Sequence, residues 1–143
     1  MIEIKNKKAY FDYTILEEIE AGISLVGTEI KSVRKGSVDL KDSFITIKNN
    51  EAFVLNMYIA KYEEGNIFNH DERRTRKLLL HKKEIKKLKE KVKIEGLTLI
   101  PLKLYFKKNY VKVLVGICKG KKLYDKRASI KERDLKRETR YYS

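Results

Sequence analysis

The hydrophobic residues of the C-terminal half alternate with polar ones over two long stretches. Residues 110–118 place every second side chain on one apolar side, as a strand with one buried face does, and that side comprises Val111, Val113, Val115 and Ile117. Residues 97–106 form a comparable apolar run, and Lys108-Asn109 joins the two. The pattern predicts two antiparallel strands here, the longest of the protein.

Shorter stretches of the same kind precede them. Aromatic, β-branched and other apolar residues gather over residues 10–16, 19–26, 44–48, 52–57 and 77–80. Ala21-Gly22 lies inside the second stretch and indicates a bulge or a close approach of two backbones. Asn49-Asn50 separates the third from the fourth and is typical of a hairpin turn.

Two segments have a helical period instead. Residues 27–36 predict a short helix with Thr28 as its cap, Gly36 as its end, and Ile30 and Val33 facing inwards. Residues 82–92 predict an amphipathic helix whose buried stripe consists of Ile85, Leu88 and Val92.

The remaining segments complete the expected organisation. Residues 1–8 are polar and should be frayed, and residues 61–71 read as a loop. The fold class is mostly β with short helices (α+β): a small antiparallel barrel of the oligonucleotide-binding kind, with about six strands and two to three helices, over residues 1–118. Residues 119–143 lose the apolar pattern and form a basic C-terminal tail, expected to be disordered when free.

Charge is distributed unevenly over the 143 residues. The net charge is +14, yet residues 1–72 are slightly acidic, and residues 73–91 alone contain ten Lys or Arg against two Glu. Such asymmetry favours a polyanionic partner, nucleic acid first and an anionic membrane surface second. The chain has no apolar stretch of about 18 residues, no signal peptide and no lipidation motif, so we expect no membrane partner.

Catalytic and metal sites find little support. Cys118 is the single cysteine, which excludes an intrachain disulfide and fits a buried side chain in a reducing cytoplasm. No Walker loop, dinucleotide fingerprint or nucleophile elbow is present. His70-Asp71 could begin a metal site, but no further ligand follows at a suitable spacing. We therefore expect no enzyme, no metal and no cofactor, and a protein that acts as a monomer.

Features for binding RNA agree better with each other. The basic residues Arg73, Arg74, Arg76 and Lys77 would meet the phosphate backbone. Aromatic residues lie beside charged ones over residues 10–13, 105–108 and 110–112, as side chains that stack on unpaired bases do. Glu20, next to Ala21-Gly22, could accept a hydrogen bond from a nucleobase amino group or could simply be solvated.

Several runs, read together, resemble the SmpB (SsrA-binding protein) family. The similarity covers nearly the full chain, from Asn6 to about Arg133. Its most specific motifs are Arg-Thr-Arg-Lys-Leu-Leu-Leu at 74–80 and Lys-Gly-Lys-Lys with Asp-Lys-Arg between 119 and 127. Further matches are Glu20-Ala21-Gly22-Ile23, residues 27–34, Asp42-Ser43 and residues 101–105.

The resemblance implies a barrel that binds the tRNA-like domain of transfer-messenger RNA (tmRNA) and delivers it to stalled ribosomes. It implies that an RNA-binding face includes or adjoins Asn6, Glu20, Leu79, His81, Lys112 and Lys119. It also implies that the tail becomes helical on the ribosome, in the decoding centre and the empty mRNA channel. The tail residues expected to bind there are Gly120, Lys121, Lys122, Tyr124, Asp125, Lys126, Arg127, Lys131, Arg133, Lys136 and Arg137.

Two alternatives stay open at this stage. A general single-stranded nucleic-acid-binding protein could use the same barrel, and it would not prefer a folded tRNA-like RNA over a plain oligonucleotide. A phosphodiesterase using His70 and Asp71 would cleave its substrate only in the presence of a metal.

Overall fold

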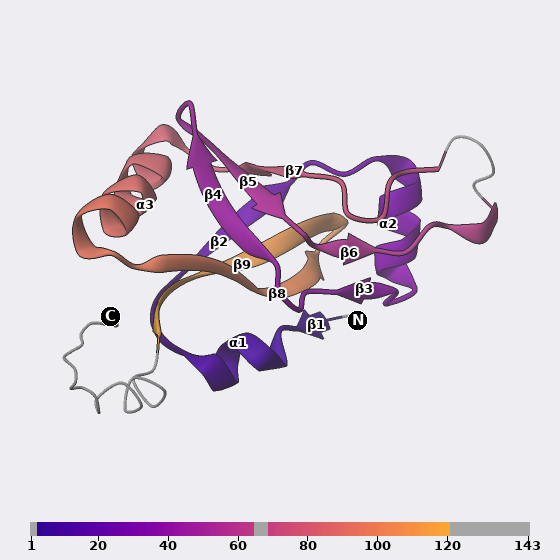
Figure 1. The fold of residues 1–143 in the computed structure, drawn as a ribbon. Coiled ribbons are helices and arrows are strands. Elements are labelled where there is room, and N and C mark those ends of the chain that lie inside the picture. Colours follow the sequence, from indigo (N-terminus) through magenta and orange to yellow (C-terminus); the bar gives the residue numbers. More distant parts are fainter. Residues whose placement is uncertain (1–2, 65–68, 121–143) are drawn as a thin grey trace.

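One strongly curved antiparallel sheet makes up most of the protein (Figure 1). The computed structural model describes residues 3–64 and 69–120, so the expected tail residues from Lys121 onward lie outside the described residues. In chain order the elements are β1 (Glu3–Lys5), α1 (Lys7–Asp12), β2 (Tyr13–Ile23), α2 (Gly27–Arg34), β3 (Val38–Asp39), β4 (Phe44–Lys48), β5 (Glu51–Leu55), β6 (Tyr58–Ile59), β7 (Arg76–Leu79), α3 (Lys82–Glu95), β8 (Thr98–Lys107) and β9 (Tyr110–Gly120).

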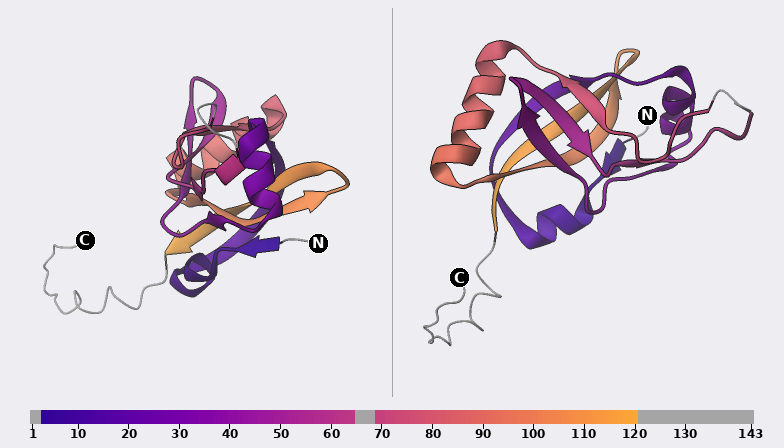
Figure 2. Two further views of the ribbon diagram at one scale, coloured as in Figure 1. Left: turned by 90° about the vertical axis from the view of Figure 1, so that its right-hand side faces the viewer. Right: turned by 45° about the horizontal axis from the view of Figure 1, so that its top comes forward.

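The main sheet has the strand order β1-β8-β9-β2-β7-β5-β4. β2 and β9 pair over nearly their whole lengths, from Tyr13 opposite Gly120 to Gly22 opposite Lys112. The sheet curls until β4 contacts β8 without pairing to it, and α3 contacts both strands. α3 therefore covers the opening between β4 and β8 (Figure 2), an arrangement like the partly open oligonucleotide-binding barrel.

Two apolar clusters hold these elements together. The main core fills the inside of the curved sheet, and its most deeply buried members include Val33, Leu40, Val54, Met57, Ile59, Leu88, Leu104, Val113, Val115 and Ile117. A smaller cluster of Ala9, Ile100, Leu102 and Cys118 joins α1 to β8 and β9. Gly116 makes this second contact possible, because a Cβ atom there would lie only 2.5 Å from Leu102 Cδ1.

Most of the elements expected from the sequence are confirmed. The mostly β, antiparallel fold is present, with three helices among the described residues. The Asn49-Asn50 hairpin joins β4 to β5, and both asparagines adopt the left-handed conformation, with φ of 53° and 61°. Val111, Val113, Val115 and Ile117 are all buried, as the alternation predicts.

The N-terminal segment differs from its prediction. Residues 3–5 form β1, which pairs with β8 and is not frayed. Residues 10–12 belong to α1 and not to a strand, because Asn6 Oδ1 caps the helix by accepting from the Ala9 N–H at 3.1 Å. Residues 13–23 form one continuous strand, and its register shift lies between Ile15 and Glu17. Of the two possibilities expected at Gly22, the close approach is the one present: a Cβ atom there would lie 3.3 Å from Leu79 Cβ of β7.

Smaller corrections concern the helices and the end of the barrel. Val26, not Thr28, occupies the position before α2, and its N–H donates to Glu29 Oε1 at 2.9 Å. Val92 of α3 is 40% exposed and not buried. β9 continues to Gly120, so the barrel extends two residues beyond Cys118. None of the described helices has the length and apolar character that a membrane-spanning helix requires.

Candidate nucleic-acid interface

The outer surface of the sheet carries a row of residues that crosses five neighbouring strands. Cα pairing runs from Glu3 to Tyr105, then to Lys112, Gly22 and Leu79. The residues next to them along each strand point into the core, so the alternation of a strand turns these five outwards. We call them the outer row.

Glu20 faces the same side as the outer row and is held by two neighbours. The Tyr105 hydroxyl donates to Glu20 Oε2 at 2.5 Å, and Lys107 Nζ donates to Oε1 at 3.2 Å. The hydrogen bond from Tyr105 lowers the pKa of Glu20 despite partial desolvation, and the charges of Lys107 and Lys112 lower it further. The result is an ionised, oriented carboxylate that still has lone pairs for a ligand.

A small hollow of about 160 Å³ opens at Gly22, two residues along β2 from Glu20. Leu79, Tyr110 and Lys112 border it, and the side chains of Leu79 and Tyr110 are 54% and 71% exposed. Gly22 keeps the hollow open, because a Cβ atom there would lie 3.3 Å from Leu79 Cβ. An apolar wall, a ring and a cation at one place suit an unpaired nucleobase and its phosphate.

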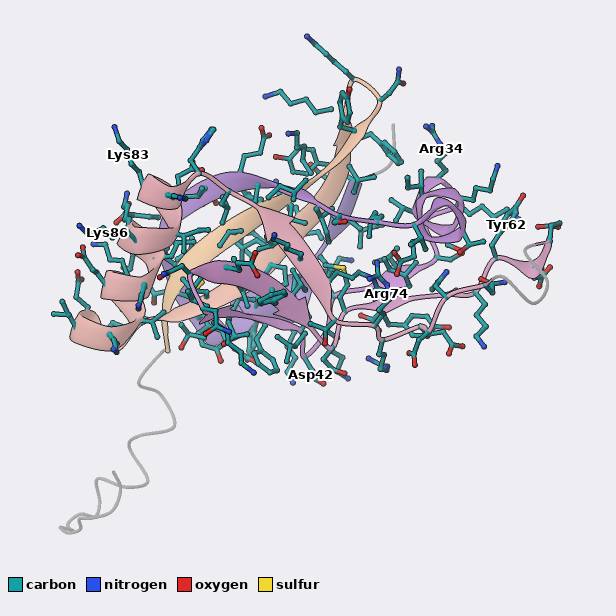
Figure 3. The ribbon with its side chains drawn as sticks, turned by 90° about the horizontal axis from the view of Figure 1, so that it is seen from above. Arg34, Asp42, Tyr62, Arg74, Lys83 and Lys86 are labelled. Atoms are coloured by element: carbon teal, nitrogen blue, oxygen red, sulfur yellow. The ribbon has the colours of Figure 1, made fainter. Side chains whose placement is uncertain are left out.

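The basic run at residues 73–77 is engaged by the protein itself. Arg73 contacts the Tyr58 ring at 5.2 Å and Asn56 Oδ1 at 3.3 Å. Lys77 pairs with Glu51 at 2.7 Å on the surface. Arg74 lies between α2 and the sheet (Figure 3), with one nitrogen 2.7 Å from Glu29 Oε1. These three residues keep some exposure, but none of them belongs to the outer row.

Arg76 is fully buried, and its predicted contact with RNA is wrong. Arg76 Nε donates to Glu29 Oε2 at 2.6 Å, and its other nitrogens donate to backbone carbonyls, including Met57 O at 2.6 Å. Burial opposes ionisation of Glu29, yet the hydrogen bonds from Arg74, the Val26 N–H and Arg76 outweigh it and lower the pKa of Glu29. This cluster ties α2 to β7. The burial of Arg76 could have been predicted from the alternation of a strand, because Arg76, Leu78 and Leu80 share one side of it.

Asn6 is also a structural residue. Its side chain is buried and bonded at every polar atom: Nδ2 donates to Leu40 O at 3.2 Å and to Pro101 O at 3.0 Å, and Oδ1 caps α1. The resemblance places Asn6 on or near the RNA-binding face, and in the described structure the side chain itself serves the protein interior. Asn6 thereby fixes α1 against β8.

The other expected residues lie at different places. Leu79 and Lys112 line the hollow, and Glu20 lies on the same face of the sheet two residues from Gly22. The exposed Lys119 lies seven residues farther along β9 than Lys112, about 23 Å away at the rise of a strand. His81 is exposed as the N-cap of α3 and follows β7 by two residues. Gly120, expected in the tail site, is the last residue of β9 and pairs with Tyr13.

The sequence marks residues 105–108 and 110–112 as stretches suited to stacking on bases, but it does not assign Tyr105, Lys107 or Tyr110 individually to the RNA-binding face. The turn in the sequence could have indicated their pairing. Lys108-Asn109 is a two-residue hairpin connection, which sets Lys107 opposite Tyr110 and Tyr105 opposite Lys112. Only the partnership with Glu20, 85 positions away in sequence from Tyr105, required the structure.

The groups considered for other chemistry have structural surroundings. His70 is buried, with its ring nitrogens 2.8 Å from Thr28 Oγ1 and 2.9 Å from Ile59 O. Within residues 3–64 and 69–120, no group of three or more His, Cys, Asp or Glu could hold a metal ion. Burial raises the pKa of the Cys118 thiol to about 11, which keeps it protonated and unreactive at neutral pH.

Comparison with known proteins decides the family. The family model described as "SmpB protein" matches residues 3–142. The chain belongs to the SmpB family. SsrA-binding proteins of Ligilactobacillus salivarius and Carboxydothermus hydrogenoformans are 57% and 58% identical to it, over 95% and 94% of this chain and 88% and 90% of theirs.

A solved structure agrees with this SmpB assignment. A chain described under "tmRNA-SmpB: a journey to the center of the bacterial ribosome" is 48% identical, with a TM-score of 0.73. The match covers 90% of the present chain and 94% of that one. The family resemblance found in the sequence motifs is therefore confirmed.

Proposed function

We propose that this protein is the RNA-binding adaptor of trans-translation: it binds the tRNA-like domain of tmRNA and brings it to stalled ribosomes. Membership of the SmpB family supports this function, as does the likeness to the solved structure named for tmRNA, SmpB and the ribosome. The observation that carries the proposal is the outer surface of the sheet, on which Glu20, Leu79 and Lys112 all lie.

Different residues of this surface suit different parts of the RNA. Lys112 neutralises a phosphate, which positions the RNA without reading its sequence. Leu79 and Tyr110 offer apolar and aromatic surface to an unstacked base. Glu20, oriented by Tyr105 and Lys107, is repelled by phosphate and accepts from a nucleobase amino group or a sugar hydroxyl. The basic residues attract any RNA, and Glu20 makes the surface selective.

The tail completes the proposed function. Residues 121–143 carry nine Lys or Arg against four acids, which suits ribosomal RNA in the decoding centre and the empty mRNA channel. The barrel would bind tmRNA, and the tail would bind in the mRNA channel only when no mRNA occupies it.

Gel shifts test the proposal directly. Full-length protein should bind the tRNA-like domain at least tenfold more tightly than an unstructured oligonucleotide of equal length, and Glu20→Gln should reduce that preference. Equal affinity for both RNAs would favour a general single-strand binder. A reconstituted stalled ribosome should then receive the tmRNA-encoded peptide tag only when the protein is present.

A further inference from the structure

Helix α3 carries a stripe of four lysines that point to one side. Lys82, Lys86, Lys89 and Lys93 follow each other at intervals of four, three and four residues, which places them on one helix face over about 16 Å. All four are exposed, and no ion pair or hydrogen bond engages any of their side chains among the described residues. In Figure 3, the Lys86 side chain projects away from the barrel.

The opposite side of α3 is neutralised. Glu17 of β2 lies 2.7 Å from Lys87 Nζ and 3.2 Å from Lys91 Nζ, and Glu95 lies 3.3 Å from Lys91. Charge on α3 is therefore compensated where the helix faces β2 and left uncompensated on the side away from it. β2 also contributes Gly22 to the outer row, so the neutralised side of α3 faces the strand that leads to the proposed tmRNA site, and the lysine stripe lies on the other side of the helix.

Folding does not account for the stripe. Lysines spaced three or four residues apart repel one another and weaken a helix. Burial of Ile85 and Leu88 holds α3 on the barrel, and Gln or Ala on the solvent side would serve the helix as well without the repulsion. An arrangement that costs stability and contributes no contact within the described residues points to a ligand.

A groove of about 740 Å³ runs beside the stripe, between α3 and the β4–β5 hairpin. Asn49 and Asn50 of the turn line it opposite the lysines, and Ile85 and Ile94 add apolar surface. Two acids also line it: Glu51, already paired with Lys77 at 2.7 Å, and Glu90. Lysines for phosphate, amides for ribose and a partly apolar floor are complementary to a nucleic-acid backbone.

The position of the stripe identifies which RNA it meets. β9 leaves the barrel after Gly120, beyond the level of Glu17 on β2, and thus at the end of the barrel that α3 covers. Resting on the proposed function, in which the segment after Gly120 enters the ribosome, we infer that the lysine stripe binds the sugar–phosphate backbone of ribosomal RNA. tmRNA and the ribosome then occupy separate surfaces of one barrel.

A triple variant tests this inference in the full-length protein. Lys86→Gln, Lys89→Gln and Lys93→Gln together remove three charges of the stripe. The matched control changes Lys7, Lys41 and Lys61 to Gln, since these lysines are exposed and their side chains make no hydrogen bond or ion pair within residues 3–64 and 69–120. Affinity is measured by co-sedimentation with small ribosomal subunits without tmRNA, over a salt series, and by gel shift with the isolated tRNA-like domain.

The stripe variant should bind small subunits at least tenfold more weakly than the wild type, with a log–log salt slope smaller by roughly two. It should bind the tRNA-like domain within twofold of the wild type, and its thermal midpoint should not fall. The inference is overturned if the control loses as much subunit affinity, if the stripe variant loses none, or if it loses affinity for the tRNA-like domain. Failure of the wild type to bind the tRNA-like domain would instead refute the proposed function.

Discussion

At the scale of single residues, partners decide what a charge can do. Glu20 and Glu29 are both acids with lowered pKa values, yet one is displayed on the outer surface and the other is sealed in the core. Arg76 and Lys112 differ in the same way. The sequence shows which residues are charged, but it does not show which of these side chains are free to bind RNA. The partner of Arg76, for example, lies 47 positions away, in α2.

Tyr105 should act through Glu20. Tyr105→Phe removes the hydroxyl that orients the carboxylate, so binding to the tRNA-like domain should weaken by about 1 kcal/mol, the typical worth of such a hydrogen bond. Tyr110→Phe is the control, since no hydrogen bond of the Tyr110 hydroxyl is present in the described structure. A double-mutant cycle with Glu20→Gln checks the mechanism: additive losses would show that Tyr105 contacts RNA independently.

Glu29 should control stability towards acid. Its folded-state pKa is lowered, so its contribution is complete above the unfolded value of about 4.3 and is lost as the pH falls through the folded pKa. Glu29→Gln leaves buried Arg76 without its counter-charge and should cost about 3–5 kcal/mol at pH 7.

Urea unfolding between pH 3 and 7 measures both effects of Glu29. Below pH 4, the free energy of unfolding should fall less steeply with decreasing pH in the variant than in the wild type. Glu51→Gln is the matched control, because the exposed pair with Lys77 should contribute only about 0–1 kcal/mol. Equal losses for the two variants would show that the buried cluster has no special role.

At the scale of helices and strands, the apolar pattern of the sequence predicts those elements that are stabilised by their own regular apolar face and not by distant residues. The β8–β9 pair and α3 have long, regular apolar patterns and were placed correctly. α1 was missed because its six residues depend on the cap from Asn6, which itself is held by Leu40 and Pro101. β1 was missed because its order comes from β8, about 100 residues later in the chain.

The close approach of β2 and β7 should matter for binding more than for folding. Gly22→Ala sets a methyl group 3.3 Å from Leu79 Cβ, which moves Leu79 by a few tenths of an ångström and narrows the hollow. Gly22 is extended, so the backbone accepts Ala. We expect a thermal midpoint within a few degrees of the wild type and a several-fold loss of affinity for the tRNA-like domain in gel shifts. An unchanged affinity would exclude the hollow as a contact site.

At the scale of the whole molecule, the barrel and the tail should be separable at Gly120. All five residues of the outer row lie within β1, β2, β7, β8 and β9, and thus before Gly120. The prediction from sequence placed the boundary at Cys118, where the apolar alternation ends. Backbone pairing continues to Lys119 and Gly120 opposite Thr14 and Tyr13, and such pairing leaves no trace in side-chain pattern.

Truncation after Gly120 should therefore keep one activity and lose the other. Binding to the tRNA-like domain should stay within several-fold of the intact protein, because the outer row is untouched. Peptide tagging on stalled ribosomes should be abolished, because the proposed occupant of the mRNA channel is gone. Tagging at the wild-type level would refute the role of the tail, and loss of RNA binding would place part of the tmRNA site in residues 121–143.

The pairing of β2 with β9 also has a consequence for synthesis. β2 is among the first segments to emerge from the ribosome, yet its principal partner begins at Tyr110, nearly at the end of the barrel. A barrel with such distant pairings closes late and slowly. Until β9 is made, the apolar side of β2 has no lasting cover, so a nascent chain that ends before residue 110 should be captured by chaperones and proteases. A protein that serves interrupted translation thus cannot itself fold from an interrupted chain.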